Sequence, residues 1–325
     1  MRVQSGVTPP LAADPPQGPA ARPVCLGAAG SRSRGGQAVA PAVTRPAMTL
    51  ASVCRRIVGW MVFLAGLVAG PAASAGPDGG LPVLVYHQIR STPDGPPDGP
   101  TAISLERFEA QMRILRERGY RTLDMGEVVA LLKGGAGAAG DEKVVAIHFD
   151  DAWKSALHAV PVLEGHAFKA TFWVIAGSGI GWPHMDWEEV QALDRHPQME
   201  AFSHSLTHPW KDGDTLLDWM ESRPPGRGIA DVRRELVESR GLLEARLAHP
   251  VPYLAWPRGL YNDALIALAR EAGYAALLTI DPGLNHPGDD VRRIRRTMID
   301  GACDEAVFLS VLDDGETRLC SQPAP

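Results

Sequence analysis

Residues 144–151 read Val-Val-Ala-Ile-His-Phe-Asp-Asp, and this stretch decides the fold class. Its first six residues form a short apolar run, which is typical of a strand buried on both faces of a parallel sheet. Two adjacent carboxylates, Asp150 and Asp151, follow the run directly. Parallel α/β folds place their active sites at the carboxyl ends of the strands. The stretch therefore predicts an α/β fold with acidic side chains at its functional edge.

From residue 76 onward the sequence alternates between predicted strands and helices. The predicted strands cover residues 81–86, 144–149, 170–175, 199–202, 253–256 and 275–280, and the predicted helices cover 105–118, 124–132, 231–247 and 263–272. Such alternation with short connections predicts a mostly parallel sheet covered by helices. About 250 residues is the usual size of a closed α/β barrel. Three predicted strands run directly into His87, Asp150-Asp151 and His204, so we expect one site at one mouth of the barrel.

The first 75 residues differ in composition from the rest of the chain. They hold seven Arg, one acid and no His, whereas residues 76–325 carry a net charge of −12 and all ten His. This balance provides no basic surface for nucleic acid. Of the first 47 residues, 24 are Ala, Gly or Pro, a composition that predicts a disordered extension. A translation start at Met48 would remove this extension altogether.

Residues 48–75 have the organisation of a secretory signal peptide. Arg55 and Arg56 precede an apolar run over residues 57–70, and Ala73-Ser74-Ala75 follows as a cleavage signature. The run is shorter than the roughly 20 residues that span a bilayer. We expect export to the periplasm or the extracellular space, with no stable membrane span after cleavage; an uncleaved anchor is the alternative.

Four cysteines are present, and two of them remain after such cleavage. Cys25 and Cys54 fall in the removed segment, whereas Cys303 and Cys320 stay in the mature chain. An oxidising compartment permits the last two to pair. Two free thiols are the alternative.

His204 and His208 form a pair four residues apart. Two such imidazoles can converge on one metal, and with one carboxylate they make an open site for a divalent cation. A second carboxylate beside the site could serve as a general base. For the Asp150-Asp151 pair alone, the competing interpretation is a helix cap in a loop.

Four segments resemble motifs of the NodB-type polysaccharide deacetylases, carbohydrate esterase family 4. Residues 147–151, Ile-His-Phe-Asp-Asp, resemble the family's TFDD motif, and residues 203–208, Ser-His-Ser-Leu-Thr-His, match its SH(S/T)xxH motif. Residues 254–259, Leu-Ala-Trp-Pro-Arg-Gly, resemble its RxPYG motif. Residues 81–89, Leu-Pro-Val-Leu-Val-Tyr-His-Gln-Ile, are similar to the opening of the poly-β-1,6-N-acetylglucosamine deacetylase subgroup.

The resemblance implies a deformed (β/α) barrel over residues 76–325 and a set of site residues. It makes Asp150 the general base, His87 the general acid and the backbone N–H of Arg258 an oxyanion donor. The implied metal ligands are Asp151, His204 and His208, and the implied cofactor is a divalent metal, best fitted by Zn²⁺.

The implied reaction is removal of acetate from an N-acetylglucosamine polymer. Peptidoglycan, chitin oligomers or O-acetyl esters remain alternative substrates, and a non-catalytic carbohydrate-binding protein is the alternative from another functional class. The sequence does not fix the oligomeric state.

Several positions depart from the family pattern. Ala152 stands for the usual Gly, and His148 stands for the usual Thr on the same strand face as Asp150, where we expect a core residue. Ala255 replaces the usual Arg that clamps the base, so Arg258 could approach it instead. His286 is a second candidate for the acid. Asp281 either supports a histidine or belongs to a turn.

Tryptophans border the three family motifs. Trp153, Trp210 and Trp256 could stack on sugar rings or belong to the core, and we expect Trp173 to be core. Residues 211–228 are expected to form a long loop, either over the substrate groove or on the surface.

Overall fold

The computed structural model describes residues 80–91, 99, 101–134, 142–177 and 180–315. The proposed extension at 1–47, the signal peptide at 48–75, Cys25, Cys54 and Cys320 lie outside these residues. Cys303 is buried and disulfide-bonded. Within the described part of the chain, no helix is both long and apolar enough to cross a membrane.

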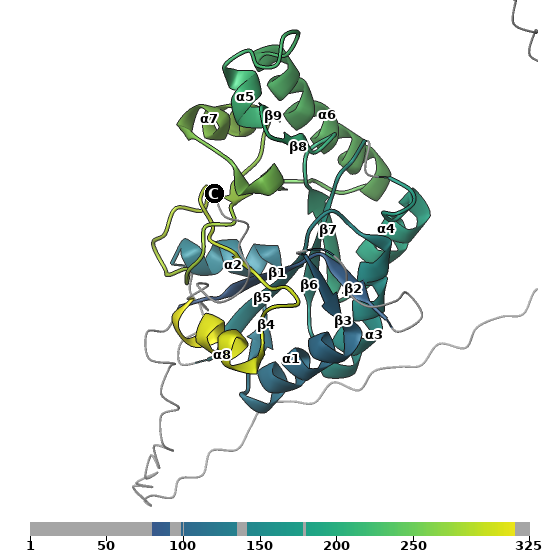
Figure 1. The fold of residues 1–325 in the computed structure, drawn as a ribbon. Coiled ribbons are helices and arrows are strands. Elements are labelled where there is room, and N and C mark those ends of the chain that lie inside the picture. Colours follow the sequence, from purple (N-terminus) through teal and green to yellow (C-terminus); the bar gives the residue numbers. More distant parts are fainter. Residues whose placement is uncertain (1–79, 92–98, 100, 135–141, 178–179, 316–325) are drawn as a thin grey trace, which may run out of the picture. The chain divides into compact units, whose positions relative to one another are not determined.

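A parallel sheet of eight strands forms the centre of the molecule (Figure 1). The strand order is β11-β10-β7-β6-β5-β1-β12, and β4 pairs with the first residues of β5. The strands are β1 (Val83–Tyr86), β4 (Arg121–Thr122), β5 (Val144–Phe149), β6 (Ala170–Val174), β7 (Met199–Ser203), β10 (Tyr253–Ala255), β11 (Ala276–Leu278) and β12 (Thr297–Met298). All six predicted strands are present, and every pairing in this sheet is parallel.

Residues 291–299, near the carboxyl end of the described chain, join the two edges of the sheet. On one side, the carbonyls of Val291 and Ile294 accept hydrogen bonds from the backbone of Leu277 and Thr279. On the other, β12 pairs with β1, and Ile299 N–H donates to the Val85 carbonyl at 2.8 Å. Residues 291–299 therefore close the curled sheet into the deformed (β/α) barrel that the sequence predicts.

Helices surround the sheet, and α1, α3 and α4 lie along its outer side (Figure 1). The helices are α1 (Leu105–Glu117), α2 (Met125–Leu132), α3 (Ala159–His166), α4 (Trp187–Asp194), α5 (Leu216–Met220), α6 (Ile229–Leu247), α7 (Asp263–Glu271) and α8 (Glu305–Asp314). Ser104 caps α1 by accepting from Arg107 N–H, and Asp124 with Glu127 forms a capping box at the start of α2. The sequence reasoning did not identify α3, α4, α5 and α8.

The segment expected to be a long loop at residues 211–228 is more ordered than predicted. β8 (Trp210–Lys211) and β9 (Asp214–Thr215) form an antiparallel hairpin, and α5 follows directly. The Thr215 side chain caps α5 by accepting from Asp218 N–H. A second small pairing, of β2 (Gln88–Arg90) with β3 (Ala102–Ser104), is parallel.

The two faces of β5 bury different kinds of side chain. Phe149 faces the outer helices, where it stacks on Phe172 with ring centroids 4.6 Å apart and lies near Tyr86 and Phe108. His148 faces the barrel interior and meets Trp173 edge to face at 5.4 Å. Because strand residues alternate between faces, Asp150 lies on the same side as His148. Both His148 and Trp173 are fully buried, as expected for core residues.

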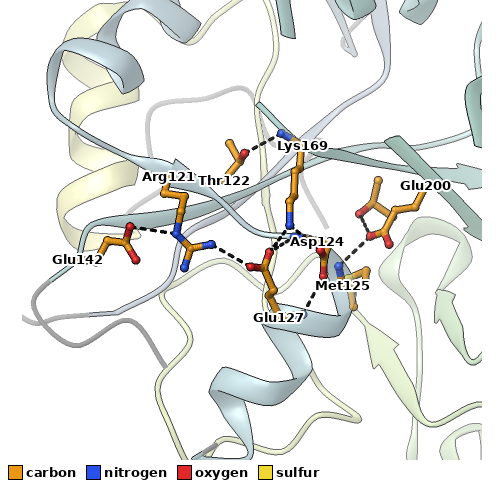
Figure 2. Close-up of polar contacts among 9 residues, drawn as sticks. Arg121, Thr122, Asp124, Met125, Glu127, Glu142, Lys169 and Glu200 are labelled. Atoms are coloured by element: carbon orange, nitrogen blue, oxygen red, sulfur yellow. Dashed lines mark hydrogen bonds and ion pairs between the residues drawn. The ribbon is translucent and has the colours of Figure 1, made fainter. Parts of the chain in front are cut away.

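A polar network occupies the amino-terminal end of β6 and β7 (Figure 2). Glu200 accepts hydrogen bonds from the Thr171 hydroxyl at 2.6 Å and from Met125 N–H, the first residue of α2, at 2.7 Å. Beside it, Lys169 Nζ lies 2.7 Å from Asp124 and 2.8 Å from Glu127. Burial raises the pKa of Glu200 to about 7, although its two hydrogen bonds oppose that rise. This network lies at the opposite end of the strands from the residues considered next.

Candidate active site

Three side chains from two strand ends converge on one point. Asp151 follows β5, and His204 and His208 follow β7; one ligand atom from each lies within 4.8 Å of the others. Asp151 Oδ1 is 3.4 Å from His204 Nε2 and 3.5 Å from His208 Nε2. The same oxygen is buried and accepts no hydrogen bond from any residue that the structure describes. Two imidazole nitrogens and one unpartnered carboxylate oxygen fit a divalent metal.

The side-chain orientations of Asp151 and His204 each have an identifiable cause. His204 Nδ1 lies 2.9 Å from the carbonyl of Ala255 on β10, which leaves Nε2 facing the carboxylate. Hydrogen bonds of this kind orient metal-binding histidines in general. Asp151 Oδ2 accepts from Trp153 Nε1 at 3.0 Å, and His184 Nδ1 lies 2.8 Å from the Asp151 carbonyl. Trp153 and His184 also stack, with ring centroids 4.4 Å apart.

The loops that carry these groups adopt backbone conformations that L-residues rarely take. Five of the eight non-glycine residues with positive φ in the described chain lie here: Asp151 (67°), Ala152 (49°), Ser205 (67°), His208 (52°) and Arg258 (56°). Each such conformation costs on the order of 1–3 kcal/mol and persists where the surrounding structure enforces it. This concentration of backbone strain makes the three loops a candidate functional site.

Asp150 is paired with an arginine that the sequence reasoning did not identify. Arg296 donates from Nη1 and Nη2 to the two carboxylate oxygens at 2.7 and 2.9 Å, and its Nε donates to the Thr279 carbonyl at 2.7 Å. Both side chains are buried. Burial alone would raise the pKa of Asp150, but the Arg296 guanidinium and the neighbouring imidazoles outweigh it and lower that pKa to about 2. Asp150 is therefore an ionised carboxylate at neutral pH.

The two histidines have opposite pKa shifts. Burial, together with the His204 charge, lowers the pKa of His208 to about 4, so its imidazole is neutral at pH 7. Burial also opposes protonation of His204, but the carboxylates of Asp150 and Asp151 outweigh it and raise its pKa. A proton on His204 thus compensates the acid pair, and a divalent cation bound among these groups would displace it.

Comparisons with known proteins agree with this geometry. Residues 137–277 match the family model described as polysaccharide deacetylase. Over this segment the chain is similar to polysaccharide deacetylases. The enzyme class that these similarities support is a hydrolase that acts on carbon–nitrogen bonds other than peptide bonds.

Individual relatives show how far the likeness extends. YxkH of Bacillus subtilis (strain 168) is 26% identical over 230 residues, which cover 70% of this chain and 74% of YxkH. The structure of IcaB from Ammonifex degensii superposes with a TM-score of 0.60 and 24% identity, over 72% of this chain and 95% of IcaB. BC0361, a polysaccharide deacetylase from Bacillus cereus, gives a TM-score of 0.58 and 23% identity, over 72% of this chain and 69% of BC0361. At identities this low, the structural likeness is evidence for the fold alone.

His87 lies beside the acid pair. The register of β1 with β5 pairs Tyr86 with Phe149, and Asp150 N–H donates to the Tyr86 carbonyl at 2.9 Å. The next residues along the two strands are therefore neighbours. His87 contributes to the lowered pKa values of Asp150 and Asp151, and its buried Nδ1 has no hydrogen-bond partner among the described residues.

The alternative acid, His286, is far from the site. It is exposed in the loop before residue 291, and its ring lies against Gly80, which precedes the amino end of β1. His87 follows the carboxyl end of the same strand, so the two histidines lie at opposite ends of the barrel. The Asp281 carboxylate accepts from the Tyr261 hydroxyl at 2.6 Å, and within the described part of the chain it bonds no histidine.

The expectation that the Arg258 side chain approaches the base is wrong. Its Nη1 donates instead to the Trp210 carbonyl at 2.9 Å and to Asp212 at 2.7 Å, which ties the β8–β9 hairpin to the loop after β10. Arg296 takes the clamping position because its own backbone lies in the segment that closes the barrel. The clamp expected at residue 255 is thus supplied from another part of the chain.

The tryptophans near the motifs differ in exposure. Trp256 is fully buried, so it is a core residue and cannot stack on a sugar. Trp153 is half-buried and supports Asp151. Trp210 is 59% exposed, and Trp182, in the loop that carries His184, is 86% exposed.

Proposed function

We propose that this chain is a metal-dependent N-deacetylase of an N-acetylglucosamine-containing polysaccharide. The observation that carries the proposal is the convergence of Asp151, His204 and His208 beside a second carboxylate, Asp150, which Arg296 holds ionised. A binding protein has no need for a charged base beside a metal site. The donor set favours Zn²⁺.

The chain would contribute three groups to the reaction, from Asp150, His87 and Arg258. A divalent cation at this site supplies Lewis-acid polarisation of the acetamide carbonyl and of the attacking water. Asp150 accepts a proton from that water as the new carbon–oxygen bond forms. The backbone N–H of Arg258 donates to the developing oxyanion. His87 donates a proton to the nitrogen as the carbon–nitrogen bond breaks, which leaves acetate and a free amine.

Two exposed tryptophans support a saccharide substrate. Trp210 lies two residues after His208, and Trp182 lies two residues before His184, which contacts the Asp151 carbonyl. Large exposed aromatic side chains on loops that hold a site are typical of binding surfaces, and their flat faces suit sugar rings. The similarity of residues 81–89 to the poly-β-1,6-N-acetylglucosamine subgroup favours that polymer as the substrate.

We further propose that the catalytic domain, residues 76–325, acts after export. The signal-peptide pattern at residues 48–75 supports this, as does the disulfide at Cys303, because disulfides persist mainly in oxidising compartments. N-terminal sequencing of the secreted protein tests it. A mature chain that begins near residue 76 is the expected result, and a protein that retains residues 1–47 would contradict it.

Acetate release from defined N-acetylglucosamine oligomers tests the activity. We expect release by the metal-loaded protein, loss of release with a chelator, and recovery when Zn²⁺ is restored. Asp150→Asn should abolish turnover while the metal stays bound, and the matched variant Asp212→Asn should remain active. Activity that is insensitive to chelation, or that survives in Asp150→Asn, would refute the mechanism. Release from peptidoglycan or O-acetyl esters alone would replace the substrate and keep the mechanism.

A further inference from the structure

The loop between β7 and the second histidine is held from behind by a buried carboxylate on α6. Glu235 is almost completely buried. Its Oε2 accepts from Leu206 N–H at 3.0 Å and from Thr207 N–H at 2.8 Å, and its Oε1 accepts from the Thr207 hydroxyl at 2.6 Å. All three donors belong to the loop that connects His204 with His208.

The loop carbonyls are held from the opposite side. The Ser205 carbonyl accepts from Ala176 N–H at 3.0 Å, and the Leu206 carbonyl accepts from Gly177 N–H at 2.8 Å. This approach requires glycine, because a Cβ at position 177 would lie 2.7 Å from the Leu206 oxygen. The loop backbone is thus clamped between the end of β6, which binds its acceptors, and Glu235, which binds its donors.

The loop needs such a clamp because its conformation is strained. Ser205 and His208 both have positive φ, at 67° and 52°. Internal hydrogen bonds also help: His208 N–H donates to the Ser205 hydroxyl at 3.1 Å, and Ser205 N–H donates to the Ser203 hydroxyl at 3.2 Å. A strained loop persists where its surroundings over-determine it.

His208 depends on this clamp more than His204 does. The His204 ring has its own anchor, because Nδ1 lies 2.9 Å from the Ala255 carbonyl. Within the described chain, the His208 ring contacts Asp151 at 3.5 Å and the His204 ring at a centroid distance of 4.7 Å. The backbone of residues 205–208 therefore determines where the second imidazole lies.

We propose that Glu235 is a positioning residue for metal binding, which acts by holding the loop that carries both histidines. This inference rests on the proposed metal site. Among the described residues Glu235 forms no ion pair, so the loop N–H and hydroxyl groups compensate its buried charge. Residues that orient metal ligands from outside the coordination sphere typically change affinity by about 10–100-fold when removed.

The chain offers a matched control on the same helix face. Ser239 lies one turn after Glu235, is buried, and bonds the Ser203 and Tyr274 hydroxyls at 3.2 and 3.0 Å. It reaches the loop only through the Ser203 hydroxyl, which accepts from Ser205 N–H, and it does not bond the N–H groups of Leu206 and Thr207 that Glu235 holds. Ser239→Ala therefore tests whether any lost polar contact between α6 and β7 has the same effect.

The experiment measures the Zn²⁺ dissociation constant by chelator competition, and the hydrogen exchange of residues 204–208 in the metal-free protein. Glu235→Ala should weaken Zn²⁺ binding at least tenfold and accelerate exchange at Leu206 and Thr207. Glu235→Gln, whose amide oxygen can still accept from the loop, should bind Zn²⁺ within about threefold of the wild type, as should Ser239→Ala. Thr207→Val removes the hydroxyl that donates to Glu235 from the loop, and it too should weaken Zn²⁺ binding. This milder variant serves as the test if Glu235→Ala fails to fold.

Two results would overturn the inference: wild-type Zn²⁺ affinity in Glu235→Ala and Thr207→Val, or an equal loss of affinity in Ser239→Ala. A wild-type protein that binds no divalent metal would refute the proposed function instead. In that case the exchange measurement on the metal-free protein still decides whether Glu235 holds the loop.

Discussion

Replacement of Arg296 by methionine removes the buried countercharge of Asp150 while keeping much of the side-chain volume. The guanidinium bonds both carboxylate oxygens, and its Nε bonds the Thr279 carbonyl, so three hydrogen bonds are lost together. Methionine can fill the space beside Trp173, over whose ring the guanidinium lies at 5.8 Å. The variant therefore isolates the loss of charge and hydrogen bonds from the loss of packing.

The magnitude follows from the position of the Asp150 pKa. In the wild type that pKa is lowered from 3.8 to about 2. Because tenfold in a proton equilibrium is worth about 1.4 kcal/mol, this amounts to about 2 kcal/mol of stability. A lowered carboxyl pKa stabilises the fold above pH 3.8, and the contribution is lost as the pH falls to about 2. Without Arg296, burial raises the pKa of Asp150, and the neighbouring imidazoles of His204 and His87 remain to oppose that rise. Removal of one partner from a buried ion pair costs about 3–5 kcal/mol, which we expect at pH 7.

Two assays measure these effects in Arg296→Met. Urea unfolding should show the fall in stability, and the pH profile of kcat/KM should show its acid limb moved to higher pH, because the base must be ionised to accept a proton. Arg295→Met is the matched control, since Arg295 is adjacent, carries the same charge and is exposed. Arg296→Lys should recover part of the stability, because one ammonium cannot bond both oxygens in the same way.

One result would refute this reasoning directly. If the acid limb of Arg296→Met coincides with that of the wild type in a folded protein, Arg296 does not control the ionisation of Asp150. If the acid limb shifted equally in Arg295→Met, the cause would be loss of positive charge in this region and not loss of the Arg296–Asp150 contact.

Three further predictions follow from the structure. Glu200→Gln should remove a pH-dependent loss of stability. Because the Glu200 pKa is raised from 4.5 to about 7, the wild type should lose about 3 kcal/mol of unfolding free energy as the pH rises through that interval, and the variant should not. If urea unfolding gave the same pH dependence of stability for both proteins between pH 5 and 8, the assignment would be contradicted. Trp210→Ala and Trp182→Ala should each raise KM for N-acetylglucosamine oligomers several-fold with little change in kcat, whereas the exposed Val237→Ala on α6 should change neither; an unchanged KM would exclude the tryptophans from substrate binding. Zn²⁺ binding should tighten as the pH rises from 5 to 8, because the raised pKa of His204 makes protons compete for the site, and a pH-independent dissociation constant would exclude that competition.

The strand ends of the barrel were predictable because each of them combines two strong local signals. An apolar run of four to six residues identifies the buried strand, and a polar residue directly after it identifies the functional edge. Parallel pairing then brings Asp151 and His204 to the same side, although they are far apart in the sequence. The family motifs add the expected role of each residue, and the structure supports the convergence of the metal-ligand set.

Arg296 was not identified because its local sequence favours another interpretation. Residues 292–296 read Arg-Arg-Ile-Arg-Arg, which resembles a solvated basic loop. In the structure Ile294 and Arg296 are buried and Arg295 is exposed, which is the two-residue alternation of a strand. That alternation was the available signal. The partner of Arg296 lies 146 residues away, and no local pattern predicts such a contact.

Glu235 was also hidden, in this case within an amphipathic helix. Val232, Leu236 and Leu243 form the apolar stripe of α6, and Glu235 lies on the same buried face. A charged residue within an apolar stripe indicates a buried acceptor, because burial of an unpartnered carboxylate is strongly unfavourable. The sequence can show that such an acceptor exists, but it cannot show that the donors belong to the loop of His204 and His208.

The absence of an arginine at residue 255 also has a structural reason, because the reactive groups and the residues that support them come from different parts of the barrel. Strand ends present the reactive groups, whereas the supports come from neighbouring parts of the barrel: Arg296 from the closing segment, the Ala255 carbonyl from β10, and Glu235 from α6. The base requires a guanidinium in contact with both carboxylate oxygens, and that requirement does not specify which strand supplies it. With Arg296 in that position, residue 255 contributes through its carbonyl, which lies 2.9 Å from His204 Nδ1. Loss of the arginine from the third motif is therefore compatible with an intact site.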